Sequence, residues 1–480
     1  MSDFSHVINK MLDKSIKFII LIILVSACCV FMALFFRNTI KSILMCTIVV
    51  ILALLSEYII LKADFSYKVK VLMILFVSVI LKIIWNINTC SYPNSDFKVM
   101  YDIAGDMIKG DFSGMKGLGY IARFPHLTFT VKYMLFIKFL APYHNILIMK
   151  MINISFSTVT VFIVYLIADI LFENKKKSMA ALIIASLFPT FITYTAVFCG
   201  ENIAMIFYVL SIYLFLKSWY SKRNKIILLF VSGVCLAVGN LFRMVALVML
   251  TIYCIYILVY SKKSIIYRLS SIIAIIMPYL LIIIIISSSL QKCRVTERPL
   301  WSGSEPKITN ILKGTNFESL GMWNERDAQF VEKNLGNYTK LIVQCRNKIR
   351  HRIIDQPKLK VMFFYMIKLC SQWCVGDFGG CLWTQKDVCE GNIILKISMI
   401  GTPIFQLMFI IMLVSILCGI KKESSNKIYL LYLIFLGYVV LYLITENQSR
   451  YGYIVSWIFV LLAASGIEST LNILKKIKSL

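Results

Sequence analysis

Repeated apolar stretches, each about twenty residues long, constrain the fold of this chain more than any other feature. A helix rises 1.5 Å per residue, so about 20 apolar residues are needed to cross the ~30 Å hydrocarbon core of a bilayer. Hydrophobic residues make up 59% of the sequence and charged residues 16%, a composition that disfavours a soluble core. We therefore predict an all-α polytopic membrane protein with about twelve transmembrane helices, over residues 18–36, 42–61, 71–88, 146–172, 179–197, 202–217, 226–241, 244–260, 265–288, 395–418, 428–445 and 451–468.

Basic residues recur in the short loops between these stretches, always on the same side of the predicted map. Cytoplasmic loops carry an excess of Lys and Arg, so this side is predicted to be cytoplasmic, with both termini inside. These loops hold most of the net charge of +27, and no recognition motif indicates nucleic-acid binding. The clusters are Lys10/Lys14/Lys17, Lys62/Lys68/Lys70, Lys175/Lys176/Lys177, Lys217/Lys222/Arg223/Lys225, Lys262/Lys263/Arg268, Lys421/Lys422/Lys427 and Lys475/Lys476/Lys478.

The map divides the chain into parts with different roles. The first apolar stretch is too long for a cleaved signal peptide and is predicted to be retained. The segment after the ninth span has several Trp residues and mixed charge, which predicts a folded extracytoplasmic loop domain or lid. The parts are two leading transmembrane helices (1–70), a transmembrane core (71–290) with a first outer loop (89–145), the extracytoplasmic loop domain (291–394) and the C-terminal transmembrane helices (395–480).

Residues 124–145 are apolar enough to suggest a further span, which would invert every later loop. We predict instead an interfacial helix on the outer surface, with Lys132 and Lys138 near the lipid headgroups.

No metal or cofactor is predicted from the sequence. Six cysteines lie in the large outer loop, at spacings that match no zinc motif and define no pairing. Nucleotide-binding glycine motifs are also missing. The loop cysteines are Cys293, Cys345, Cys370, Cys374, Cys381 and Cys389.

Polar residues that are unusual for such a chain fall on the outer side, in five separate stretches. Their convergence is the main indication of a functional site. The stretches are the segment around Asp96, the link with Glu201, the turn with Arg243, residues 291–394 and the segment "TENQSRY" that carries Arg450.

Asp96 stands apart from the other carboxylates of the first outer loop. Pro93, Asn94 and Ser95 form a helix-start signal, followed by apolar residues at helical spacing. On that amphipathic helix Asp102 and Asp106 face solvent, whereas Asp96 falls with the apolar set. It is interpreted either as a first-turn charge or as a general base in a cleft at the outer leaflet.

The remaining candidates each have a structural alternative. Glu201 is a first-turn carboxylate or a site residue, and Arg243 either snorkels or holds an anion. Arg450 pairs with Glu446 at i,i+4 if that stretch is helical, or binds a phosphate. His126 beside a proline more often packs than catalyses.

The order of these motifs resembles the bacterial branch of the family-39 membrane glycosyltransferases, which have the GT-C fold and include protein O-mannosyltransferases and lipid A aminoarabinose transferases. The resemblance covers residues 70–470, with two extra leading spans. It is carried by "SDF" and "GDF" in the first outer loop, "YIARFPH" at 120–126, "GEN" at 200–202, the arginine after "GN", "ESLGMWNERD" at 318–327 and "ENQSRYGY" at 446–453. Many members have two adjacent acids where this chain has Ser95 and Asp96.

This resemblance implies a GT-C-like bundle and a polyprenyl-phosphate-linked sugar as donor substrate. The sugar would pass, with inversion, to an extracytoplasmic glycopolymer, lipid or protein in the cell envelope. Asp96 matches the general base, and Arg243 and Arg450 are candidates for the donor phosphate. Candidate substrate contacts are Glu201, Arg123, His126, Tyr101, Trp323, Asn324, Glu446 and Tyr451.

Two other functions stay open at this point. A polysaccharide polymerase or ligase with a diphosphate-linked donor should depend on the outer arginines more than on Asp96. A transporter or flippase would need polar or broken helices in corresponding positions of two repeats, and the sequence shows no such symmetry.

Overall fold

The computed structural model describes residues 2–37, 40–89, 91–220, 224–385, 393–420 and 426–478. Helices connected by turns and loops make up these residues, and they contain no β-strand. The predicted all-α class is confirmed for this part of the chain. Lys222, Arg223, Lys421, Lys422 and Cys389 lie outside it.

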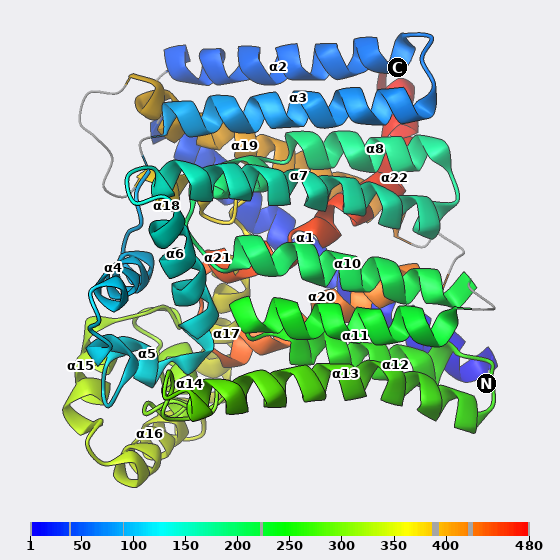
Figure 1. Cartoon of the computed structure of the whole chain (residues 1–480). Coiled ribbons are helices and arrows are strands. Elements are labelled where there is room, and N and C mark those ends of the chain that lie inside the picture. Colours follow the sequence, from blue (N-terminus) through cyan, green and yellow to red (C-terminus); the bar gives the residue numbers. More distant parts are fainter. Residues whose placement is uncertain are drawn as a thin grey trace.

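Long helices lie side by side and form the body of the molecule (Figure 1). Within the described residues, six helices are long and apolar enough to cross a membrane, or up to eight spans if each of two bent pairs is counted as one. The chain is thus a multi-pass membrane protein, and every predicted span overlaps a helix or bent pair, although a total of twelve stays a prediction. The long elements are α1 (Ser2–Arg37), α2 (Ile40–Lys62), α3 (Tyr67–Asn88), α7 (Asn145–Phe172), α8 (Lys175–Leu187), α10 (Glu201–Tyr220), α11 (Lys225–Phe242), α12 (Ala246–Tyr260), α13 (Ile265–Lys292), α19 (Ile393–Gly419), α20 (Ile428–Ile444) and α22 (Trp457–Lys478).

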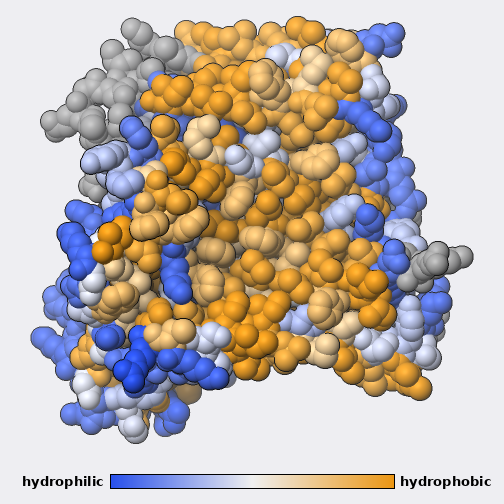
Figure 2. All heavy atoms as spheres, in the orientation of Figure 1, coloured by the Kyte–Doolittle hydropathy of each residue, from blue (hydrophilic) through white to orange (hydrophobic). Residues whose placement is uncertain are grey.

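Short helices gather at one end of the bundle, at the left of Figure 1, while both termini lie toward the other end. Figure 2 shows a broad apolar surface over the long helices, with hydrophilic residues at both ends. This distribution fits a bilayer-spanning body. The short elements are α4 (Asp96–Ile108), η1 (Ser113–Met115), α5 (Tyr120–Arg123), η2 (Pro125–Leu127), α6 (Thr128–Leu140), α14 (Ile308–Gly314), α15 (Glu325–Asn334), α16 (Tyr338–Ile353), α17 (Lys358–Trp373), α18 (Gly380–Gln385) and α21 (Ser449–Gly452).

Helix α6 covers most of the predicted interfacial segment and crosses the direction of the long helices in Figure 1. Its position relative to the lipid headgroups stays a prediction, but the contacts of Lys138 within the protein are defined. Its Nζ donates to the Tyr101 carbonyl at 2.8 Å and lies 3.3 Å from the centre of the Tyr101 ring. This lysine therefore ties α6 to α4.

One span is broken: α8 is followed by α9 (Pro189–Thr193) and η3 (Tyr194–Ala196) after a bend of 50°. Pro189 lacks the backbone N–H that would continue α8, and carbonyls freed at such a break must find other donors in a membrane. Side chains of α3 and α7 supply them: Ser78 donates to Ser186 O, Ser157 to Phe191 O, Trp85 to Thr193 O, and Asn153 to Thr195 O and Val197 O. These bonds fix the chain just before Glu201.

A second break separates α21 and η4 (Tyr453–Val455) from α22, with a bend of 61°. The two breaks meet. The rings of Tyr194 and Tyr453 stack with centroids 3.7 Å apart, and Tyr453 OH donates to Asn202 Oδ1 at 2.9 Å. The segments that carry Glu201 and Arg450 are thereby held together.

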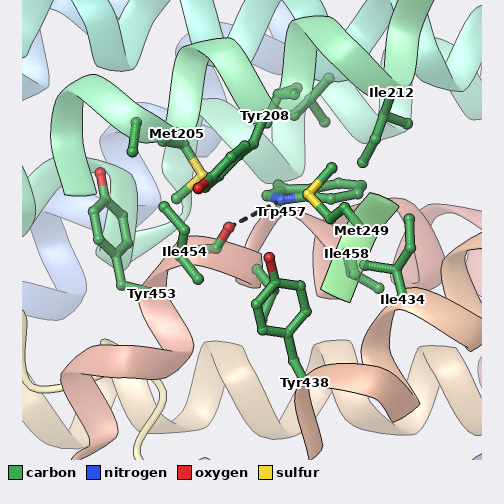
Figure 3. Packing of buried hydrophobic residues seen from close by; sticks show 14 of the residues in the cluster. Met205, Tyr208, Ile212, Met249, Ile434, Tyr438, Tyr453, Ile454, Trp457 and Ile458 are labelled. Carbon is green, nitrogen blue, oxygen red and sulfur yellow. Dashed lines mark hydrogen bonds between the residues drawn. The ribbon is translucent and has the colours of Figure 1, made fainter. Parts of the chain in front are cut away.

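Aromatic and aliphatic side chains pack together between α10, α20 and α22 (Figure 3). In this cluster α10 contributes Met205, Tyr208 and Ile212, which face Tyr438 of α20 and Trp457 of α22. Buried hydroxyls need partners, and Tyr208 donates to Arg243 O while Tyr438 donates to Val245 O. The core thus anchors the turn that carries Arg243.

The predicted loop domain over 291–394 contains two structural parts. Helices α14, α15 and α16 enclose a small core of their own, with Leu312, Val331, Leu341 and Cys345. Helix α17 packs on the bundle instead, where Trp373 meets the rings of Phe435 and Tyr442. The cysteines among the described residues form no disulfide bond.

Candidate functional site at one end of the bundle

Asp96 is the first residue of α4, as the Pro93–Ser95 signal predicted, although Ser95 makes no side-chain capping bond. Ser95 has φ 50° and ψ −128°, a backbone conformation that non-glycine residues rarely adopt and that is typical of constrained sites. Asp96 Oδ2 lies 3.7 Å from Arg450 Nη2, and its side chain is 44% exposed. The carboxylate is therefore open to solvent on one side and faces a guanidinium on the other.

Arg450, in α21, is almost completely buried, with 4% of the residue exposed. Three aromatic rings surround it: the guanidinium carbon lies 4.4 Å from the Trp383 ring centre, 4.8 Å from Phe97 and 5.5 Å from Tyr451. Its Nε and Nη1 are buried without a hydrogen-bond partner. The alternative pairing with Glu446 is not formed, since Glu446 Oε1 accepts a bond from Gln448 at 2.8 Å.

Glu201 and Arg243 form a second pair beside the first. Glu201 begins α10 and Arg243 follows the end of α11, with Glu201 Oε1 and Arg243 Nη1 3.3 Å apart. The Arg243 guanidinium carbon lies 4.4 Å from the Tyr451 ring centre. Tyr451 thus contacts both guanidinium groups. Arg243 Nε is also buried without a partner, so this arginine faces the interior of the site and does not extend toward lipid headgroups.

His126, in η2, belongs to the same group. Burial, together with the positive charges of Arg243 and Lys307, lowers its pKa to about 4, against a smaller opposing effect of Glu201. A neutral imidazole beside Arg243 and Lys307 keeps a hydrogen-bond donor and an acceptor in the site without adding charge.

Tyr120 and Trp383 are two contributors that the sequence reasoning missed. Burial raises the pKa of Tyr120, and so does the negative charge of Asp96, with which its hydroxyl forms a hydrogen bond. Tyr120 lies in the segment "YIARFPH", which is one of the motifs named above. The sequence does not show, however, that its hydroxyl bonds to Asp96. Trp383 carried no signal beyond its residue type.

Other predicted site residues lie apart from this group. Arg123 donates from Nε and Nη2 to Glu305 at 3.0 and 2.8 Å, and Tyr101 OH donates to Asn145 at 2.7 Å. Asn324 caps α15 through Asp327 N, and the neighbouring Trp323 is 52% exposed. The structure thus gathers Asp96, Glu201, Arg243, Arg450, His126 and Tyr451, with Glu446 near Tyr451.

The gathered groups form a candidate anion-binding site with a carboxylate at its edge. Two arginines present unused N–H donors in a buried, aromatic-lined space, where a charge-assisted hydrogen bond is strong. Among the described residues, no group of three or more His, Cys, Asp or Glu side chains is placed to hold a metal ion.

Comparison with known proteins identifies part of the chain. Residues 130–290, about a third of the sequence, match the family model described as dolichyl-phosphate-mannose-protein mannosyltransferase. The matched region runs from α6 to α13 and includes Glu201 and Arg243 but neither Asp96 nor Arg450. No curated protein matches the chain.

Proposed function

We propose that this protein is an inverting membrane glycosyltransferase of the GT-C type, in the bacterial family-39 branch. It moves a sugar from a polyprenyl-phosphate-linked donor to an extracytoplasmic acceptor, a glycopolymer, lipid or protein of the cell envelope. Its bilayer-spanning bundle and the partial match to a mannosyltransferase family support the donor class. The site lies at the end of the bundle opposite the basic loops, which is predicted to be the outer side.

The observation that carries the proposal is the incomplete bonding of Arg450. Burying a guanidinium is costly unless its donors are satisfied, yet two of its nitrogens have no partner and its carboxylate neighbour is 3.7 Å away. A phosphate offers the oxygens that these donors need. Arg243, which has a free Nε and also contacts the Tyr451 ring, supplies a second binding group for the same anion.

The proposed reaction uses one carboxylate. The acceptor hydroxyl oxygen attacks the anomeric carbon, the bond from that carbon to the phosphate oxygen breaks, and the phosphate leaves with the electron pair. Asp96 takes the acceptor proton as general base. A phosphate leaving group needs little acid assistance, so the paired carboxylates of glycoside hydrolases are unnecessary. Single displacement inverts the anomeric configuration.

The test is Asp96→Asn at matched expression, with transfer of radiolabelled sugar from a lipid donor scored in membranes. We expect transfer to fall by about 10²–10⁴-fold, the usual contribution of a general base. Glu297→Gln, which changes an exposed outer carboxylate that accepts a bond from Gly117 N, serves as the control. Transfer at the native rate in Asp96→Asn membranes would disprove the assignment of the base.

Transport of a lipid-linked sugar is the second candidate, because two broken spans meet beside the charged residues. Discontinuous helices often line substrate sites in transporters. A transporter would move the labelled lipid across vesicle membranes without releasing its sugar to any acceptor. A ligase with a diphosphate-linked donor would lose activity on substitution of Arg243 or Arg450 but retain it in Asp96→Asn.

A further inference from the structure

A narrow recess between α6, α7 and the chain before Glu201 has no role in the reaction described above. Its lining includes Thr130 and Tyr133 of α6, Asn153 of α7, and Phe198 and Cys199. The space is small, with room for a group about the size of one water molecule. Such a recess is too narrow for a lipid chain or a whole sugar ring, and it suits a single protruding group.

Two buried hydroxyls on this recess lack partners. Thr130 is 2% exposed, and neither its Oγ1 nor the Tyr133 hydroxyl has a hydrogen-bond partner. Asn153 commits its Nδ2 to the carbonyls of Thr195 and Val197, which leaves its carbonyl oxygen as an acceptor. Buried polar groups are normally paired, so these atoms point to a ligand that brings a hydroxyl of its own.

The recess continues the anion site. Cys199, which lines the recess, forms a side-chain hydrogen bond with Glu201. His126 lies among the charges of Arg243 and Glu201. Thr130 Oγ1 lies against Gly200, where an added Cβ would come within 2.6 Å of it. Phe242 O is equally close to that position, so a group in the recess lies next to the chain segments that carry Glu201 and Arg243.

The chemistry of the lining selects a neutral group. No charged side chain lines the recess, which disfavours a phosphate or carboxylate. Hydroxyls that both donate and accept suit an alcohol, and Phe198 and Met134 offer apolar walls for a methylene. The hydroxymethyl group of a hexose combines these properties, and it projects from the ring carbon on the far side of the ring oxygen from the anomeric carbon.

On the basis of the proposed function, we infer that the recess binds the hydroxymethyl group of the transferred sugar, so that the enzyme selects a hexose over its 6-deoxy counterpart. The phosphate then sits at Arg243 and Arg450 while the sugar ring spans the distance to Thr130 and Tyr133. A site that hydrogen-bonds a substrate hydroxyl discriminates strongly against the analogue that lacks it.

The experiment measures binding to the full chain in lipid nanodiscs by the shift in its thermal unfolding midpoint. The probes are polyprenyl phosphate alone and polyprenyl-phosphate-linked mannose, glucose and galactose, each beside its 6-deoxy counterpart. The variants are Thr130→Val and Tyr133→Phe, single and combined, which keep shape and remove a hydroxyl. Tyr213→Phe, whose hydroxyl accepts a bond from Lys217 on the cytoplasmic half of α10, is the matched control.

For at least one sugar the native protein should bind the hexose lipid at least about tenfold more tightly than the 6-deoxy lipid, the effect of one well-made hydrogen bond. The double variant should lose this preference and bind polyprenyl phosphate as the native protein does. Binding of polyprenyl phosphate with no hexose preference, or a preference that survives in the double variant, would overturn the inference alone. Failure of polyprenyl phosphate and all six sugar lipids to bind would overturn the proposed function and, with it, this inference.

Discussion

Arginines pair with carboxylates both in the α14–α16 cluster and at the end of the bundle that carries Arg450, and the pairs in these two regions differ in how completely they are bonded. In the exterior cluster of α14–α16, Arg352 donates to both oxygens of Asp327 at 2.8 and 3.0 Å and to Leu312 O at 2.9 Å. Asn316 and Asn324 also donate to that carboxylate. At the outer end of the bundle the Arg450–Asp96 and Arg243–Glu201 pairs are longer, at 3.7 and 3.3 Å.

The contrast separates a structural ion pair from a binding site. The Asp327 carboxylate is buried, which alone would raise its pKa, but its bonds from Arg352, Asn316 and Asn324 lower the pKa below the ordinary value. The arginines at the bundle end are not satisfied in this way, because Nε and Nη1 of Arg450 and Nε of Arg243 have no hydrogen-bond partner. A protein retains such donors when a ligand completes them, which is the basis of the assignment made for Arg450.

The largest effect is expected from Arg352→Met. This change leaves Asp327 buried without its cation, and breaking a buried pair costs about 3–5 kcal/mol. Hydrogen exchange of α14–α16 in nanodiscs measures the local opening free energy. Arg326→Met is the control in the same cluster, because its pair with Glu318 is exposed on both sides, and it should change stability by less than about 1 kcal/mol.

Arg450→Met should leave the stability of the protein almost unchanged and weaken its binding of the donor lipid. Asp96 is 44% exposed and regains water when its partner is removed, so the thermal unfolding midpoint should hardly change. Binding of polyprenyl phosphate should weaken by at least about 100-fold, because a charge-assisted, forked contact is lost. Arg450→Lys should recover part of the affinity, because lysine restores the positive charge but cannot make the two parallel hydrogen bonds of a guanidinium. A large loss of stability with unchanged lipid binding would place Arg450 in the structural class with Arg352.

Tyr120→Phe tests whether the hydrogen bond from the Tyr120 hydroxyl positions the Asp96 carboxylate for sugar transfer. The change removes one hydrogen bond to a charged group, for which about a tenfold loss in the rate of transfer is expected. Donor affinity, measured as the concentration for half-maximal rate, should stay unchanged because the hydrogen bond that is removed goes to Asp96 and not to either arginine. Tyr338→Phe, in the exterior cluster, is the control, and an equal loss there would show that the effect is not local.

The smallest effect concerns pH. The folded-state pKa of His126 is about 4 and the unfolded value about 6.5, so the unfolded chain binds the proton more readily between these values. Stability from this group is thus complete above pH 6.5 and is lost as pH falls toward 4. In His126→Gln, the slope of the unfolding midpoint against pH should become shallower over this window. An unaltered slope would mean that His126 is not held neutral by Arg243 and Lys307.

Much of the molecule follows from the order of residues along the chain. Apolar length predicted the spans, and the helix-start signal placed the beginning of α4 at Asp96, because both depend on local composition and backbone preference. The buried face of α4, with Phe97, Met100, Ala104 and Met107, also follows from helical periodicity. Convergence of polar residues on one end follows from counting spans, since alternate loops must share a side.

The partners of each charge were decided only by the tertiary structure. Sequence spacing allowed Arg450 to pair with Glu446, whereas its carboxylate comes from Asp96, far away in the chain. Two broken spans bring these segments together through the Tyr194–Tyr453 stack and the Tyr453–Asn202 bond. Contacts of this kind depend on packing between distant helices, which no local pattern encodes. The same packing gives Arg352 hydrogen bonds to both oxygens of Asp327 and leaves Nε and Nη1 of Arg450 without a partner.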